Sequence, residues 1–201
     1  MKRVFGLCVA VAALALVMPR FTAAHDEPGS NALRQEVIAS MMDAGGKIME
    51  LAGALPEKKF VWRPAKGVRS ANEVFLHVIG ANYMIPTLLG ASTGKSMDEL
   101  MKLEKSNPGK AKVEAMLKDS YDVASKAIAS VPDSEMDTKV DFFGNMMTKR
   151  AIMMLLSAHS HEHLGQSIAY SRMNGVVPPW TAREMESAKK AASAKKATGG
   201  M

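Results

Sequence analysis

The chain has 201 residues, of which 47% are hydrophobic and 23% charged, and its formal net charge is +6. This profile is typical of one globular domain with short appendages, and it excludes collagen-like, wholly disordered and coiled-coil-only proteins. Aromatic residues make up only 5% of the chain, whereas methionine occurs 17 times, so the apolar content lies in helix formers and predicts an all-α protein.

Residues 1–24 have the layout of a secretory signal. Lys2 and Arg3 form a positive end, residues 4–17 carry no charge, and small residues lead up to a cleavage point after Ala24. Cleavage there would give a periplasmic or secreted protein with no stable membrane span. A permanent membrane anchor is the alternative, but the apolar run is short for that role.

Removal of this segment changes the charge and the thiol content of the chain. The net charge falls from +6 to +3, because Lys2, Arg3 and Arg20 leave and no acidic residue does. The single cysteine, Cys8, leaves as well. The mature protein is therefore expected to have neither a disulfide nor a cysteine nucleophile.

Residues 25–180 are expected to form one domain of four long helices, each bounded by proline, glycine or a capping residue. A capping box at Ser70–Glu73 starts the second helix, and Pro86 should kink or end it. The connections are longer than in simple bundles, so a crossover or a short inserted helix from Ser96 is expected. The segment before the fourth helix is expected to be a loop. The four helices are predicted at 31–55, 70–89, 110–131 and 148–174.

Residues 181–201 form a Lys/Ala-rich tail that is expected to be disordered. The four lysines of its segment AKKAASAKKATGGM have no opposing acid, which is typical of a solvated chain end. No aromatic residues lie between these lysines, so binding to nucleic acid is not expected.

Histidines on the fourth predicted helix are candidates for chemistry. His159 and His163 are four residues apart and therefore share one helix face, which the apolar stripe through Ile152 indicates is buried. Gln166 and Tyr170 extend this face by two turns. They are weaker candidates for residues that support a site or orient a substrate.

His77 lies on a similar apolar stripe of the second predicted helix. If the two faces meet inside one bundle, three imidazoles converge, and three neutral imidazoles are a sufficient protein shell for Zn²⁺ or another first-row divalent metal. The alternative is that each histidine is a hydrogen-bonded core residue, because a buried polar group without a partner costs a few kcal/mol.

Two segments resemble one known family. FVWRPAKGVRSANEVFLHVIGANY and LLSAHSHEHLGQSIAYSRMNGVVPP are similar to the pattern of the DinB-like (YfiT-like) metalloenzymes, over about residues 30–180. The resemblance implies a four-helix bundle with long connections and a metal held by His77, His159 and His163. Arg63–Pro64 and Gly165–Gln166 also match the family pattern.

This sequence departs from that pattern in two ways. Many members carry arginine where this chain has Leu164, so any role of that arginine is absent here. The best characterised relatives use cytosolic thiols as cosubstrates, whereas this chain is expected to be exported. Thiol transfer is therefore not implied for it.

A second motif overlaps the same histidines. His159, Glu162 and His163 form an H-x-x-E-H pattern, in which the glutamate would activate water. This interpretation leaves His77 unused and needs a late acidic ligand, for which only Glu184 and Glu186 are available. Glu162 remains a weak candidate for a base or for a residue that supports the site.

Methionine pairs at 41–42, 146–147 and 153–154 allow a copper site, because thioethers bind Cu(I). Their helical spacing favours a role as adaptable core residues instead.

The sequence thus predicts an exported protein with a three-histidine divalent metal site, acting as a metal-dependent hydrolase or transferase. Zn or Ni is the first choice of metal, followed by Fe or Mn. The alternatives are a non-catalytic periplasmic metal-binding or stress-related module and a purely structural bundle. The pattern identifies neither a catalytic residue nor the small-molecule substrate, and it allows a homodimer.

Overall fold

The computed structural model of the protein describes residues 30–198, with side chains described over 31–195. The predicted signal segment, residues 1–24, and the expected new terminus at His25 lie outside these residues.

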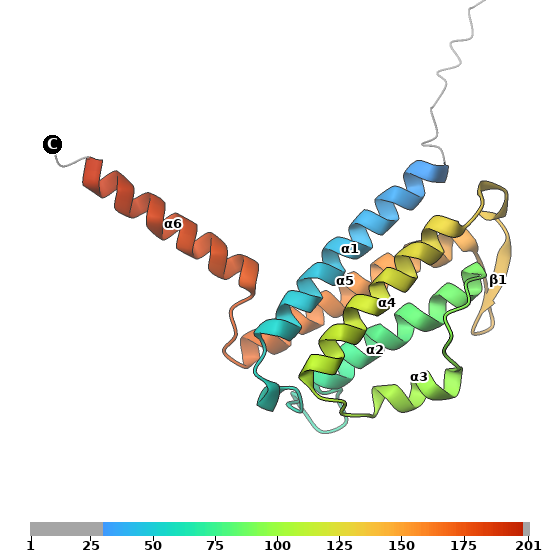
Figure 1. Cartoon of the computed structure of the whole chain (residues 1–201), viewed down its shortest axis with the longest axis horizontal. Helices are drawn as coiled ribbons and strands as arrows, with labels where there is room; N and C mark the ends of the chain where they lie inside the picture. The colour runs from blue at the N-terminus through green and yellow to red at the C-terminus, as the bar shows by residue number, and fades with distance from the viewer. Residues whose placement is uncertain (1–29, 199–201) are drawn as a thin grey trace, which may run out of the picture.

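Four long helices pack side by side into a bundle (Figure 1). Helix α1 contacts α5, α5 contacts α2, α2 contacts α4, and α4 contacts α1, so the four form a closed ring around one core. This confirms the predicted all-α class and the four predicted helices. Their bounds are α1 Ser30–Ala54, α2 Ala71–Met84, α4 Lys110–Ser130 and α5 Lys149–Met173.

Helix α2 begins at the predicted capping box and ends at Met84, short of residue 89 and just before Pro86, where the sequence predicts a kink or an end. The Ser70 hydroxyl accepts from the Glu73 amide at 3.2 Å, and the Glu73 carboxylate accepts from the Ser70 amide at 2.6 Å, which forms the capping box. At Pro86 the helix gives way to a 3₁₀ turn, Ile85–Leu89, which ends at Gly90 with φ 97°. The predicted extra helix is α3, Met97–Glu104, which has its own capping box and packs on α2.

A β-hairpin occupies the segment expected to be a loop. Strands β1 (Lys139–Phe142) and β2 (Asn145–Thr148) pair antiparallel, with Phe142 opposite Asn145. The two turn residues, Phe143 and Gly144, both have positive φ, at 51° and 85°. Such turns ordinarily carry Asn-Gly or Asp-Gly, so the phenylalanine conceals the hairpin signal in the sequence.

The core explains a glycine in the middle of α1. A Cβ atom at Gly45 would lie 2.7 Å from the Tyr121 ring of α4, which is closer than real contacts allow. Tyr121 is fully buried and its hydroxyl donates to Ser160 on α5 at 3.3 Å. Gly45 therefore permits close packing of three helices at the cost of some helix propensity.

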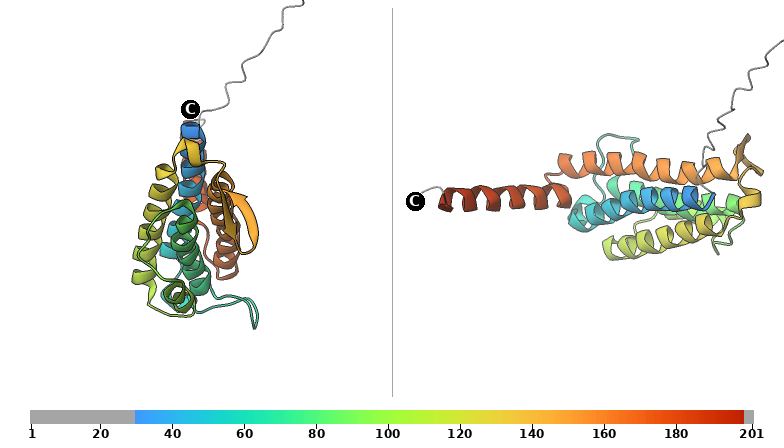
Figure 2. Two further views of the ribbon diagram at one scale, coloured as in Figure 1. Left: turned by 90° about the vertical axis from the view of Figure 1, so that its right-hand side faces the viewer. Right: turned by 90° about the horizontal axis from the view of Figure 1, so that it is seen from above.

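The C-terminal segment is a helix, α6 (Pro179–Thr198), so the prediction of a disordered tail is wrong over residues 181–198. Alanine, lysine and glutamate favour helix, and proline suits its first position. Figures 1 and 2 show α6 extending away from the bundle. Trp180 packs against the core, and Arg183 pairs with Glu50 at 2.9 Å. Within residues 30–198 no helix has the length and apolar character needed to cross a membrane.

Candidate metal centre

The structure brings His77, His159 and His163 together, as the sequence predicts. The His77 ring from α2 lies 5.2 Å from the His159 ring and 4.9 Å from the His163 ring, and the two α5 rings are 4.4 Å apart, all between centroids. Each histidine offers one ligand atom such that the three atoms lie within 4.8 Å of one another. The inward faces of α2 and α5 therefore meet at these three residues.

The spacing of one pair of ring nitrogens suits a shared cation. Two nitrogens bound to one ion at about 2.0–2.1 Å lie roughly 3.0–3.4 Å apart. Nε2 of His77 and Nε2 of His159 are 3.2 Å apart. Nδ1 of His159 is buried and has no hydrogen-bond partner in the protein. An ion at Nε2 leaves Nδ1 as the outer nitrogen of His159, so the fit to a divalent metal rests on the convergence of the three rings and on the spacing of the two Nε2 atoms.

The outer nitrogens of two histidines are held by other side chains. Nδ1 of His77 lies 2.9 Å from Oε2 of Glu104, whose other oxygen accepts from Nε of Arg69 at 2.7 Å. Nδ1 of His163 lies 2.8 Å from Oε1 of Gln166. Such partners fix the ring orientation and the tautomer of a metal-binding histidine, leaving Nε2 free for the ion.

Gln166 is oriented in turn by Tyr170. Its amide nitrogen donates to the Tyr170 hydroxyl at 3.1 Å, and this hydroxyl donates to the Arg69 carbonyl at 3.2 Å. The Tyr170 ring packs edge-on against Trp62 at 5.3 Å between centroids. Arg69 therefore supports both ends of the site, through its guanidinium toward His77 and through its carbonyl toward His163.

Burial keeps two of the imidazoles neutral. Burial, followed by the nearby His163, His77 and Arg69, lowers the pKa of His159 to about 3. Burial also lowers the pKa of His163, against the opposing effect of its bond with Gln166. Neutral imidazole is the form that binds metal, so these rings need not lose a proton near pH 7.

Glu104 is ionised beside the histidine cluster. Burial raises the pKa of Glu104, but the hydrogen bonds and charges of Arg69 and His77 outweigh it, so the pKa lies below its usual value. The sequence motifs do not point to this residue. It lies on the predicted inserted helix, four residues after the buried Leu100, and this spacing places it on the inward face.

The H-x-x-E-H alternative is not formed. Glu162 is exposed, and Glu184 and Glu186 are exposed on α6, away from the bundle. His161 points away from the other histidines of α5, as expected, and its Nε2 lies 3.0 Å from the Ser40 hydroxyl. The methionine pairs are split between core and surface: Met153 is fully buried, whereas Met146 and Met154 are exposed.

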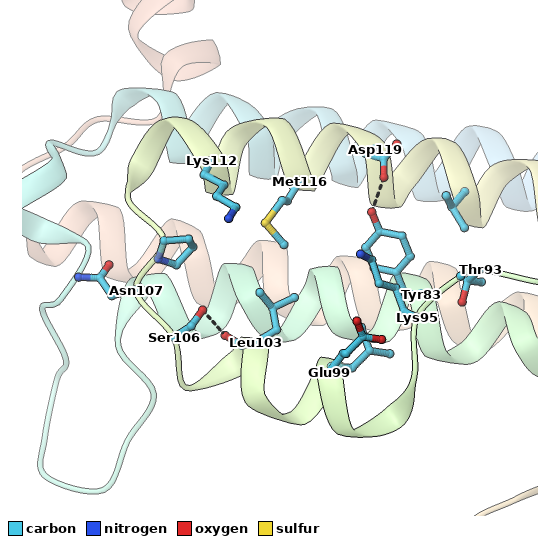
Figure 3. A pocket seen from close by; sticks show the side chains of 14 residues that line it. Tyr83, Thr93, Lys95, Glu99, Leu103, Ser106, Asn107, Lys112, Met116 and Asp119 are labelled. Atoms are coloured by element: carbon cyan, nitrogen blue, oxygen red, sulfur yellow. Dashed lines mark hydrogen bonds between the residues drawn. The ribbon is translucent and has the colours of Figure 1, made fainter.

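Two cavities flank α3. One, of 440 Å³, is lined in part by His77, His159 and Glu104 and therefore opens onto the three-histidine cluster. The other, of 710 Å³, lies between α3 and α4 (Figure 3). It contains none of the three histidines, and its charged lining includes Asp119, which accepts from the Tyr83 hydroxyl.

Comparison with known proteins agrees with the fold and with the family resemblance. The sequence model of the DinB family matches residues 25–196. The crystal structure of a DinB-like protein from Bacillus cereus is similar, with a TM-score of 0.60 and 19% identity, covering 72% of this chain and 95% of that one. A DinB-like protein from Bacillus subtilis gives a TM-score of 0.56 and 18% identity, covering 71% and 93%. No match is found among curated proteins.

Proposed function

This chain belongs to the DinB family, and we propose that it is an exported metalloprotein that binds one divalent ion through His77, His159 and His163 for hydrolysis or group transfer. The observation that carries the proposal is the convergence of three imidazoles, two of them oriented by Glu104 and Gln166. Residues 1–24, with their signal-like layout, support export.

The bound ion would be Zn or Ni, with Fe or Mn as the next choices. A divalent ion held by neutral imidazoles would keep its full charge and would act as a Lewis acid that polarises substrate oxygens and lowers the pKa of water. The protein contributes the placement of this charge. Glu104 and Gln166 hold the rings, and Tyr170 holds Gln166.

An open site beside a cavity favours a reaction over storage. No fourth side chain joins the three histidines among the described residues, and the 440 Å³ cavity adjoins two of them. A structural zinc site has four protein ligands, whereas catalytic sites have three and an open position. This observation favours the enzyme over a non-catalytic metal-binding or stress-related module.

Elemental analysis of protein purified without an affinity tag tests the proposal. We expect about one transition-metal ion per chain, lost in the His159→Ala/His163→Ala variant. His161→Ala is the matched control, because this histidine lies on the same helix outside the cluster, and it should keep the metal. Equal metal content in all three proteins, or none in the parent protein, would overturn the proposal.

A further inference from the structure

The 440 Å³ cavity beside the three histidines is polar at one place only. The polar side chains of its lining are His77, His159 and Glu104, and His77 contacts both of the others. The remaining walls are methionine, aliphatic and phenylalanine side chains, with small residues on α2. A pocket of this size, apolar with a few convergent polar groups, is the usual form of a small-molecule site.

The tip of the β-hairpin supplies an aromatic wall. Phe143 lines the cavity, although it is 73% exposed and has φ 51°, a left-handed conformation that bulky side chains rarely adopt. Its ring lies 4.9 Å from that of Phe142, between centroids. Packing of the bundle does not account for an exposed ring at a strained turn position. Such backbone outliers cluster at ligand sites.

The apolar surface continues away from the histidines. A neighbouring cavity of 280 Å³ shares Met84, Met97, Phe142 and Phe143 with the first. Its other lining residues are Leu88, Thr87 and Asp141, and the Asp141 carboxylate accepts from the Gly144 amide of the hairpin turn. Met97 is 48% exposed and Met101 64% exposed. Flexible methionines on an open apolar surface adapt to ligands of varied shape. The two cavities together therefore suit an elongated apolar group.

We infer that the ligand of this site is an amphiphilic small molecule. Its oxygen-donor head group lies at the three histidines, and its extended apolar body lies along Met97, Met101 and Phe143. The position of the head group rests on the proposed function, whereas the apolar body is inferred from the cavity alone.

Calorimetric titration of the zinc-loaded protein with two hydroxamates tests the inference. Octanohydroxamate and acetohydroxamate share one metal-binding head and differ in the apolar chain. Each fully buried methylene strengthens binding about fourfold, so burial of three or more predicts at least about 50-fold tighter binding of octanohydroxamate. Equal affinity of the two probes would overturn the inference while leaving the metal site intact.

Substitutions in the cavity wall test where the alkyl chain of the bound probe lies. Phe143→Ser and Met101→Ser should each weaken the binding of octanohydroxamate about fivefold or more, which is roughly the contribution of one or two buried methylenes. The binding of acetohydroxamate should not change. Met185→Ser is the matched control, because Met185 on α6 is 63% exposed, nearly the same as Met101. An equal loss of affinity for both probes, or an equal loss for octanohydroxamate in Met185→Ser, would contradict the proposed position of the apolar body.

The zinc content of the same samples separates the two proposals. If zinc does not bind, the proposed function fails, and the metal-free protein is titrated with decanoate and butyrate. Binding of decanoate alone, weakened by Phe143→Ser, would support the apolar site. No binding of decanoate would overturn it.

Discussion

Glu104 links the candidate metal site to a third helix. Glu104 lies on α3, and its carboxylate contacts both His77 on α2 and Arg69 in the connection that precedes α2. A partner of this kind raises the basicity of a metal-binding histidine and fixes its orientation. The precision of the site therefore depends on a short helix that contributes no ligand.

Replacing Glu104 with glutamine should weaken metal binding without abolishing it. Loss of the charge that orients His77 is expected to lower zinc affinity by about 10- to 100-fold. Competition titration against a zinc-chelating dye measures this. Asp98→Asn, at an exposed position of the same helix, is the control and should bind zinc as the parent protein does. Unchanged affinity in Glu104→Gln would show that this contact does not support the metal.

Residue spacing predicts neighbours on one helix better than neighbours on different elements. His163 and Gln166 are three residues apart on α5, so their contact follows from helix geometry. Glu104 and His77 are separated by 27 residues, and their contact depends on how α3 folds back on α2. Sequence periodicity indicates an inward face for each helix but not which faces meet.

The capping box of α2 stabilises the helix that carries His77, and its contribution depends on pH. Hydrogen bonding from the Ser70 amide lowers the pKa of Glu73 against the opposing effect of burial, with further lowering by Arg63. A carboxyl group whose pKa is lowered in the folded state stabilises the fold above its unfolded pKa of about 4.5, and this contribution is lost as pH falls through the folded pKa.

Glu73→Gln keeps a capping side chain but removes the titrating charge. Its free energy of unfolding should fall below that of the parent by about 0.5–1 kcal/mol at pH 7, and the difference should shrink below about pH 4.5. Urea unfolding at pH 7, 5 and 3.5 measures this. Glu36→Gln, at an exposed site of α1, should show little change at any pH. If the difference in the free energy of unfolding between Glu73→Gln and the parent protein stayed constant with pH, the lowered pKa of Glu73 would not be the source of the stabilisation.

Helix α6 should be the least protected of the long helices. It is largely exposed, and a surface ion pair such as Arg183–Glu50 contributes little because solvent screens it. Amide hydrogen exchange over residues 184–195 should therefore be much faster than over α5. Deletion of residues 184–201 should change the free energy of unfolding of the bundle by less than about 1 kcal/mol. Protection equal to that of α5 would show that α6 has a partner.

At the scale of the whole molecule, the metal site ties together two sides of the bundle. His77 belongs to α2 and the other two histidines to α5, so a bound ion would join helices far apart in the chain. A ligand that binds only the folded state stabilises it in proportion to the logarithm of its concentration over Kd. Folding and metal binding should therefore be coupled.

Zinc should raise the thermal stability of the protein. At a free concentration about 100 times Kd, the free energy of unfolding increases by about 2.7 kcal/mol, which corresponds to a rise of roughly 5–10 °C in Tm. Scanning calorimetry with zinc and then with excess chelator measures the rise and its reversal. The His159→Ala/His163→Ala variant should show neither. A Tm that responds to neither zinc nor chelator would support a purely structural bundle.

The bundle was predictable from sequence because its signals are local and repeated. Each of the four helices has its own apolar stripe and its own start or stop signal, such as a capping box or a proline. The hairpin was missed because its strands are four residues each and Phe143 occupies the turn position where Asn or Asp is usual. The helix at 179–198 is hard to predict because lysines without opposing acids are typical of a solvated chain end, whereas the alanines among them favour helix.

A crystal structure of the zinc-loaded protein, purified without an affinity tag and measured at the zinc absorption edge, tests the central claim most directly. We expect one anomalous peak per chain, about 2.0–2.1 Å from a ring nitrogen of each of His77, His159 and His163. A peak held by His161 or by surface carboxylates, or three imidazoles with no peak between them, would contradict it.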